Sequence, residues 1–276
     1  MKGFNRLVFL AIICALVYYV GWKDDKHTTI QNIIQRTTTQ PPVPVTTPPP
    51  PPTQPAFPTS MADRMLPPWP PAEDSSKTTQ LADSLTTKNF VLIFDGSGSM
   101  AKQGCSGNRS KNEVARDAVI EWAASVPDDA NLGLVVFDSS GFSIRLPLGL
   151  GNRPQFKAEI QKVVPDRSTP LAAALDLAQS MLTDQARKQL GYGDYTVVIV
   201  TDGAADDIPA LENSVNKVLA TSPVMIHTIG FCIAADHSLN RAGRTTYRAA
   251  NNPAELRRGL QEVLAESESF DISGFK

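Results

Sequence analysis

The sequence predicts an α/β fold with a doubly wound, mostly parallel β-sheet that is covered by helices on both faces. From residue 89 onward, short apolar runs alternate with longer segments of helical periodicity, which is typical of parallel sheets. Two of the apolar runs end in Asp-Gly, at 95–96 and at 202–203. Ligands of such open sheets bind beyond the carboxyl ends of the strands, so we expect a site at that edge.

Four short apolar runs predict buried parallel strands, and a fifth segment predicts an antiparallel hairpin partner. The four runs are nearly continuous in Val, Ile, Leu and Phe, as expected for strands buried on both faces. The fifth segment follows a Ser140-Gly141 turn. The predicted strands are 89–95, 132–138, 195–203 and 224–231, with the hairpin partner at 142–149.

Three segments carry apolar residues three or four positions apart, and this spacing predicts helices that bury one face. They span 110–127, 170–182 and 253–266, and the second begins with proline in its first turn. The predicted inward faces hold Val114, Ala118, Val119 and Trp122 in the first, Leu171, Leu175, Ala178 and Leu182 in the second, and Leu256, Leu260, Val263 and Leu264 in the third.

The N-terminal region predicts a membrane anchor. Residues 7–22 carry no charge and follow two positive charges in residues 1–6. As a helix they span about 24 Å, slightly less than the hydrocarbon layer of about 30 Å. A cleaved signal peptide is the alternative, but no small-x-small cleavage pattern follows the apolar run. We therefore expect an uncleaved anchor with residues 1–6 in the cytoplasm.

A proline-rich linker is predicted to follow the anchor over residues 23–87. Between residues 41 and 71, 14 of 31 residues are proline, which is incompatible with helix or sheet. We expect a disordered, extended spacer, with a PxxP ligand as the alternative interpretation. The globular domain is predicted at 88–270, and 271–276 form a tail. From Lys88 onward, 19 Lys and Arg face 22 Asp and Glu, a net charge of −3 that gives no indication of a nucleic-acid surface.

Five oxygen-bearing residues point to a metal site at the predicted sheet edge. Asp95, Ser97 and Ser99 are two positions apart in a tight loop, and the glycines between them allow a sharp backbone. Thr169 precedes a predicted helix, and Asp202 ends a predicted strand. Such oxygen ligands suit a hard cation, Mg²⁺ first, with Mn²⁺ or Ca²⁺ as alternatives. The simpler alternative is a capped turn, with Thr169 as a helix N-cap.

This constellation and the order of elements resemble the von Willebrand factor type A (VWA) domain with its metal-ion-dependent adhesion site. The family motif is Asp-x-Ser-x-Ser, then a distant Thr and a distant Asp, and all five positions match over a resemblance that covers residues 89–266. It implies a Rossmann-like fold in which Ser97 and Ser99 bind the ion directly and Asp95 and Asp202 bind it mainly through water. Thr169 would enter or leave the shell with conformational state.

One departure from the family pattern lies beside the predicted site. Arg167-Ser168 stand before Thr169, where many bacterial relatives carry small residues. An arginine there either weakens the affinity for a metal or helps to bind an acidic ligand. The segment after residue 229 looks like bacterial members of the family.

The predicted function follows from the charge of such a shell. Neutral hydroxyl ligands leave the cation much of its positive charge, which favours a carboxylate from a partner in the open position. We therefore expect a membrane-tethered module for protein–protein interaction or adhesion in the bacterial envelope. It would lie on the periplasmic or extracellular side of the cytoplasmic membrane, with no small-molecule substrate.

Two other functions use the same fold or the same residue types. One is a VWA subunit that assists an AAA+ ATPase or a chelatase-type complex, which the anchor and spacer disfavour. The other is a metal-dependent hydrolase. A phosphotransferase would need a second acid where Ser97 stands, and a serine hydrolase would need Gly-x-Ser-x-Gly, so we expect no enzyme.

The remaining polar residues near the predicted site are expected to be structural. Asp206 and Asp207 are interpreted as helix N-terminal acids, His227 as a core residue, and His237 as part of a turn. Cys105 and Cys232 follow elements that end at the same sheet edge, so a disulfide between them is possible. Two unpaired thiols are the alternative.

Overall fold

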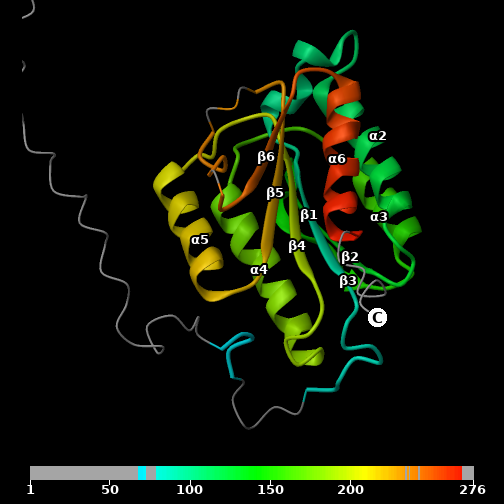
Figure 1. The fold of residues 1–276 in the computed structure, drawn as a ribbon. Coiled ribbons are helices and arrows are strands. Elements are labelled where there is room, and N and C mark those ends of the chain that lie inside the picture. Colours follow the sequence, from blue (N-terminus) through cyan, green and yellow to red (C-terminus); the bar gives the residue numbers. More distant parts are fainter. Residues whose placement is uncertain (1–67, 73–78, 234, 236, 242, 269–276) are drawn as a thin grey trace, which may run out of the picture. The chain divides into compact units, whose positions relative to one another are not determined.

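A computed structural model describes residues 68–72, 79–233, 235, 237–241 and 243–268 (Figure 1). The predicted anchor, most of the predicted linker and the tail lie outside these ranges. Within the ranges, no helix is both long and apolar enough to cross a membrane.

Six strands of the described chain form one sheet, in the order β3-β2-β1-β4-β5-β6 (Figure 1). Five strands run parallel, and β3 pairs antiparallel with β2 at one edge. This confirms the predicted mostly parallel sheet with its hairpin partner. The strands are β1 Asn89–Asp95, β2 Asn131–Asp138, β3 Gly141–Gly149, β4 Tyr195–Thr201, β5 Met225–Phe231 and β6 Thr246–Ala250.

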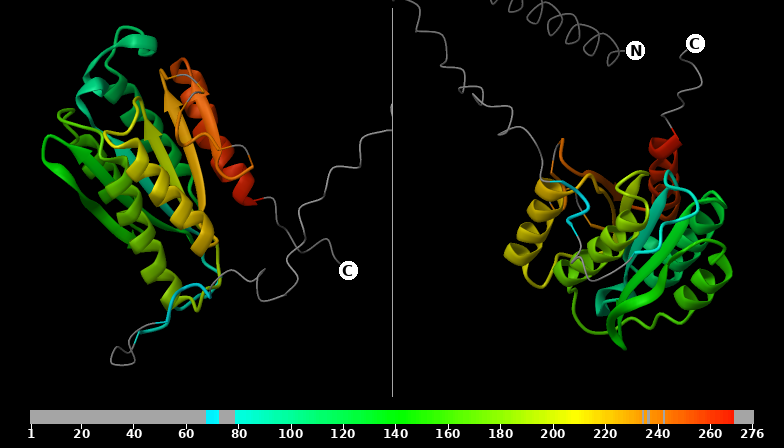
Figure 2. Two further views of the ribbon diagram at one scale, coloured as in Figure 1. Left: turned by 90° about the vertical axis from the view of Figure 1, so that its left-hand side faces the viewer. Right: turned by 90° about the horizontal axis from the view of Figure 1, so that it is seen from below.

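Helices cover both faces of this sheet, as Figures 1 and 2 show. Residues of β1 alternate between the two layers, because successive side chains of a strand point to opposite faces. Phe90, Leu92 and Phe94 join one buried cluster, and Val91 and Ile93 join the other. The first cluster lies under α2 Lys111–Ser125, α3 Arg153–Gln161 and α6 Pro253–Glu268, and the second under α4 Leu171–Lys188 and α5 Ile208–Thr221.

The structure buries all twelve residues that we predicted on the inward faces of α2, α4 and α6. Besides two short 3₁₀ helices, it contains three elements that the sequence analysis did not predict, namely α3, α5 and β6. Helix α3 is short and buries only Phe156 and Ile160, which is too little to give a clear period. Strand β6 has five residues and is only partly buried. Helix α5 buries Leu211, Val215 and Val218. Their spacing is helical, so the sequence contained a signal for this helix that the sequence analysis missed.

Part of the predicted linker packs against the domain. The ring centroids of Trp69 and Tyr195 lie 4.7 Å apart in an edge-on arrangement. A Cβ atom at Gly191 would approach the carbonyl oxygen of Trp69 to 2.9 Å, so this glycine leaves room for the segment. Further along, the amide of Ala82 donates to the carbonyl of Lys188 at 2.9 Å. The packed region therefore begins before Lys88.

His227 is buried in β5, as expected of a core residue, and only 4% of it is exposed. Burial lowers the pKa of its imidazole, and the nearby Glu266 carboxylate opposes this effect. The lowered pKa means that an unfolded chain takes up a proton at a higher pH than the folded chain. The contribution of His227 to stability is therefore present above about pH 6.5 and is lost as the pH falls.

We predict that His227→Gln flattens the acid dependence of stability. The difference in free energy of unfolding between the wild type and the variant should shift in favour of the variant between about pH 7.5 and pH 5.5. Urea unfolding of both full-length proteins in EDTA measures this difference, because other titrating groups cancel between them. A difference that does not change with pH would contradict the assignment.

Candidate metal site

The five predicted metal ligands lie on three loops at the carboxyl ends of neighbouring strands. Asp95 is the last residue of β1, and Asp202 directly follows β4, the strand paired with β1. Ser97 and Ser99 lie in the loop after β1, where residues Gly98–Ala101 form the short 3₁₀ helix η2. Thr169 lies just before α4. The fold thus brings all three loops to the sheet edge where we expected a site.

Hydrogen bonds tie these loops together. The amide of Gly98 donates to the carbonyl of Arg167 at 3.1 Å, which joins the β1 loop to the segment before α4. Arg167 adopts a left-handed backbone conformation with φ of 66° and is exposed. The amide of Thr169 donates to Asp206 Oδ1 at 2.9 Å, and the amide of Asp206 donates back to the Thr169 carbonyl at 3.1 Å.

Three side-chain oxygens form a continuous row at the centre of the site. Ser97 Oγ lies 3.0 Å from Ser99 Oγ, and Ser99 Oγ donates to Asp202 Oδ1 at 2.6 Å. Adjacent oxygen ligands of an octahedral Mg²⁺ ion lie about 3 Å apart, because each Mg–O bond is about 2.1 Å long. The spacing and the all-oxygen chemistry of this row therefore fit a small hard cation.

Asp95 lies behind this row and is fully buried. Its Oδ1 accepts from the amide of Ser97 at 2.8 Å, and its Oδ2 accepts from the hydroxyl of Thr201 at 2.6 Å. Burial raises the pKa of Asp95 to about 6, the charge of Asp202 adds to this effect, and the hydrogen bonds from Ser97 and Thr201 oppose it. The carboxylate thus ties the serine loop to the end of β4.

The structure places a lysine side chain, Lys111, at this site, which the sequence analysis missed. Lys111 is the first residue of α2, and its ammonium group forms an ion pair with Asp202 Oδ2. The Lys111 side chain is 11% exposed, and the Asp202 side chain is fully buried. The helix start is set by a capping box, in which Ser110 and Glu113 bond each other's backbone amides. In the sequence, this cap indicates that Lys111 begins a helix. No sequence pattern indicates that Lys111 pairs with Asp202.

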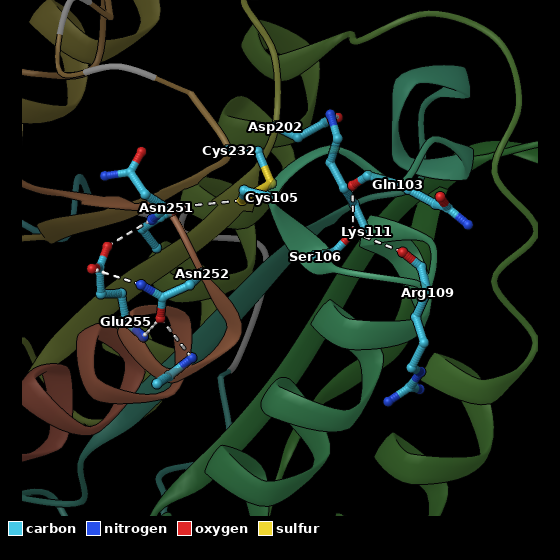
Figure 3. Close-up of a disulfide and its surroundings, with 12 residues drawn as sticks. Gln103, Cys105, Ser106, Arg109, Lys111, Asp202, Cys232, Asn251, Asn252 and Glu255 are labelled. Carbon is cyan, nitrogen blue, oxygen red and sulfur yellow. Dashed lines mark hydrogen bonds and ion pairs between the residues drawn. A yellow bond between two sulfur atoms is a disulfide. The ribbon is translucent and has the colours of Figure 1, made fainter.

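Cys105 and Cys232 are joined by a disulfide in the structure (Figure 3). Cys105 lies in η3, a short 3₁₀ helix over Gly104–Ser106, and Cys232 directly follows β5. The bond ties the loop before α2 to the sheet. Figure 3 shows Lys111 and Asp202 beside the disulfide, so the bond fixes a loop that borders the site.

Two neighbouring residues support the site loops. The side chain of Asp207 caps α5 by accepting from the amide of Ala210 at 2.8 Å, as predicted for a helix N-terminal acid. Asp206 instead binds Thr169, a role that the sequence analysis did not assign.

His237 is structural, as expected, and supports the loop after Asp202. Its Nδ1 accepts from the amide of Leu239 at 3.1 Å, so Nε2 carries the hydrogen and donates to the carbonyl of Gly203 at 3.0 Å. Within the described residues, no group of three or more His, Cys, Asp or Glu side chains gathers as in a carboxylate-rich or thiolate metal site.

The six-stranded, mostly parallel sheet with helices on both faces is the fold of a von Willebrand factor type A domain. The sequence profile of that family matches residues 90–204, a stretch that contains all five predicted ligands. The chain thus contains a VWA domain, as its resemblance to the family implied.

Similar proteins include an uncharacterized protein, YwmD, of Bacillus subtilis strain 168. It is 26% identical over 203 residues, which cover 66% of this chain and 87% of YwmD. Among solved structures, a von Willebrand factor type A protein from Catenulispora acidiphila superposes with a TM-score of 0.55 at 18% identity, covering 66% of this chain and 43% of that one. The conserved hypothetical protein BatB from Bacteroides thetaiotaomicron gives a TM-score of 0.50 at 15% identity, covering 65% and 98%. At these identities the structural likeness shows the fold alone.

Proposed function

We propose that this VWA domain binds one divalent cation, Mg²⁺ in preference to Mn²⁺ or Ca²⁺, and uses it to bind an acidic residue of a protein partner. The observation that carries this proposal is the row of Ser97, Ser99 and Asp202 oxygens, spaced as adjacent ligands of an octahedral ion. Thr169 and Asp95 complete the proposed set. Bound there, the cation would supply a positive charge that is only partly neutralised by its protein ligands.

Exposed apolar side chains on segments that adjoin the site loops support a partner-binding face. Val164 is 57% exposed, and its carbonyl accepts from the amide of Ser139 in the loop after β2. Ile208 is 44% exposed and begins α5, two residues after the Asp206 that binds Thr169. Large apolar residues beside a polar anchor point are a common composition for a protein interface.

We further propose that residues 7–22 anchor the chain in the cytoplasmic membrane of a bacterium and that the proline-rich spacer holds the domain on the periplasmic or extracellular side. The disulfide between Cys105 and Cys232 supports this location, because such bonds persist in oxidising compartments. We propose a binding role without catalysis, since a cation held by neutral hydroxyls would keep much of its charge for the carboxylate of a partner.

A retention experiment tests this function. The full-length chain in detergent is immobilised and exposed to extracts of the source cell's envelope, with Mg²⁺ or with EDTA. The Ser97→Ala/Ser99→Ala variant serves as the matched control on a second column. We expect a protein that is retained only by the wild type and only with Mg²⁺. Partners retained equally in EDTA would show that another surface does the binding.

A further inference from the structure

The Lys111 side chain lies beside the proposed metal site, because its ammonium group pairs with the proposed ligand Asp202. Its ammonium group holds Asp202 Oδ2, while the other oxygen of the same carboxylate faces Ser99. One carboxylate is therefore shared between the lysine and the row of oxygens that we propose as metal ligands. A divalent ion at Oδ1 would therefore share this carboxylate with the ammonium group at Oδ2.

The lysine is held in this position by the loop above it. The backbone amide of Lys111 donates to the carbonyl of Lys102 at 2.9 Å. A Cβ atom at Gly104 would approach Lys111 Cε to 3.2 Å, so the loop passes close over the side-chain stem. The disulfide at Cys105 ties this loop to the end of β5. The ammonium group is thus enclosed beside Asp202, and a swing into solvent would require the loop to move.

The positive charge of Lys111 offsets part of the negative charge of the two aspartates at the site. Asp95 and Asp202 bring two negative charges, and Lys111 cancels one of them before any ion binds. Two like charges only a few ångströms apart repel strongly where water is largely excluded. Lys111 therefore balances the charge of the ion-free site and opposes the entry of a divalent cation.

We infer that Lys111 is a built-in counter-cation that sets the metal affinity of this site. It weakens the binding of a divalent cation and leaves the loaded site one charge more positive than it would be without the lysine, which favours an anionic ligand. The inference rests on the proposed metal site and adds to it a residue that controls the affinity.

The test compares Lys111→Gln with Lys102→Gln in the full-length chain in detergent. Glutamine at 111 removes the charge and keeps a hydrogen-bond donor for Asp202. Lys102 is exposed on the same loop, so its replacement changes the net charge equally without touching the ion pair. Binding of Mn²⁺ is measured at fixed pH and ionic strength from the electron paramagnetic resonance signal of the free ion. Thermal unfolding in EDTA shows whether each variant folds, and Lys111→Met provides a second variant without the charge.

We expect Lys111→Gln and Lys111→Met to bind Mn²⁺ about tenfold more tightly than the wild type or better, and Lys102→Gln to stay within about twofold. If the wild type binds Mn²⁺ and the folded Lys111 variants bind it equally or more weakly, the inference is overturned while the metal site stands. If neither the wild type nor the variants bind Mn²⁺ at millimolar concentration, both the inference and the proposed metal site are wrong.

Discussion

Gly96→Ala is expected to destabilise the domain by about 3 kcal/mol, whereas Gly98→Ala, two residues later, should change its stability by less than about 1 kcal/mol. A Cβ atom at Gly96 would lie 2.7 Å from the Phe137 carbonyl oxygen, 2.8 Å from Val163 Cγ1 and 2.9 Å from Asp138 Cβ. These distances are far below van der Waals contact, and one of the atoms belongs to the backbone.

Relief of this clash would disturb the centre of the sheet. The amide of Gly96 donates to the same Phe137 carbonyl at 2.8 Å, and β1 pairs with β2 throughout its length. The chain therefore has no room to move away without breaking strand pairing. At Gly98 the nearest atom to a new Cβ is the Arg167 carbonyl oxygen at 3.6 Å, which is ordinary contact.

Urea unfolding of both variants in EDTA measures the two effects without any contribution from a bound ion. The pair is a matched test, because both substitutions add one methyl group to the same Asp-Gly-Ser-Gly-Ser loop. Equal stability of the two variants would contradict the close contacts described around Gly96. We also expect Gly96→Ala to weaken metal binding, since Asp95 and Ser97 flank the displaced residue.

The second large effect is expected at Asp95, where we predict that stability and binding change in opposite directions. Asp95→Asn should be more stable than the wild type in EDTA near neutral pH and should lose measurable Mn²⁺ binding. Burial raises the pKa of the Asp95 carboxyl to about 6, so the folded state holds its proton more tightly than the unfolded chain. Stability is therefore lost as the pH rises from about 4 to 6.

Asparagine avoids this loss because it carries no charge, and it retains the hydrogen bonds. Its carbonyl oxygen can accept from the amide of Ser97, and its amide can donate to Thr201, whose hydroxyl lies 3.2 Å from the Gly203 carbonyl. The gain at pH 7.5 is on the order of 1 to 3 kcal/mol, and it should vanish below about pH 4. Saturating Mn²⁺ should raise the unfolding temperature of the wild type and not that of the variant.

Thermal unfolding with EDTA and with Mn²⁺, at several pH values, measures all of these effects. A variant less stable than the wild type in EDTA at pH 7.5 would show that the charged hydrogen bonds of Asp95 outweigh its burial. If Mn²⁺ stabilises the variant as much as the wild type, Asp95 does not contribute to metal binding.

The sequence predicted the sheet and the position of the site because both depend on local patterns. The buried strands are short apolar runs, and two of them end in Asp-Gly at neighbouring places in the sheet. The spacing of Asp95, Ser97 and Ser99 also lies within a single loop. These features are readable in one stretch of sequence at a time.

The parts that the sequence did not reveal depend on contacts between distant segments. The ion pair between Lys111 and Asp202 joins residues 91 positions apart, and no local pattern marks a lysine at a helix start as a site residue. Similarly, Asp206 has the spacing of a helix N-terminal acid, but tertiary packing directs it to the amide of Thr169. Trp69 stands in a proline-rich stretch, and only the structure shows its contact with Tyr195.

The most direct test of the metal site is Mn²⁺ binding by the full-length chain in detergent, compared with the Ser97→Ala/Ser99→Ala variant. Those serines supply two of the three oxygens in the central row, and alanine removes them without adding volume. The metal-site hypothesis predicts saturable binding of one ion per chain, displaced by excess Mg²⁺ and weakened about tenfold or more in the variant. Equal binding by both proteins, or no saturable binding by the wild type, would contradict it.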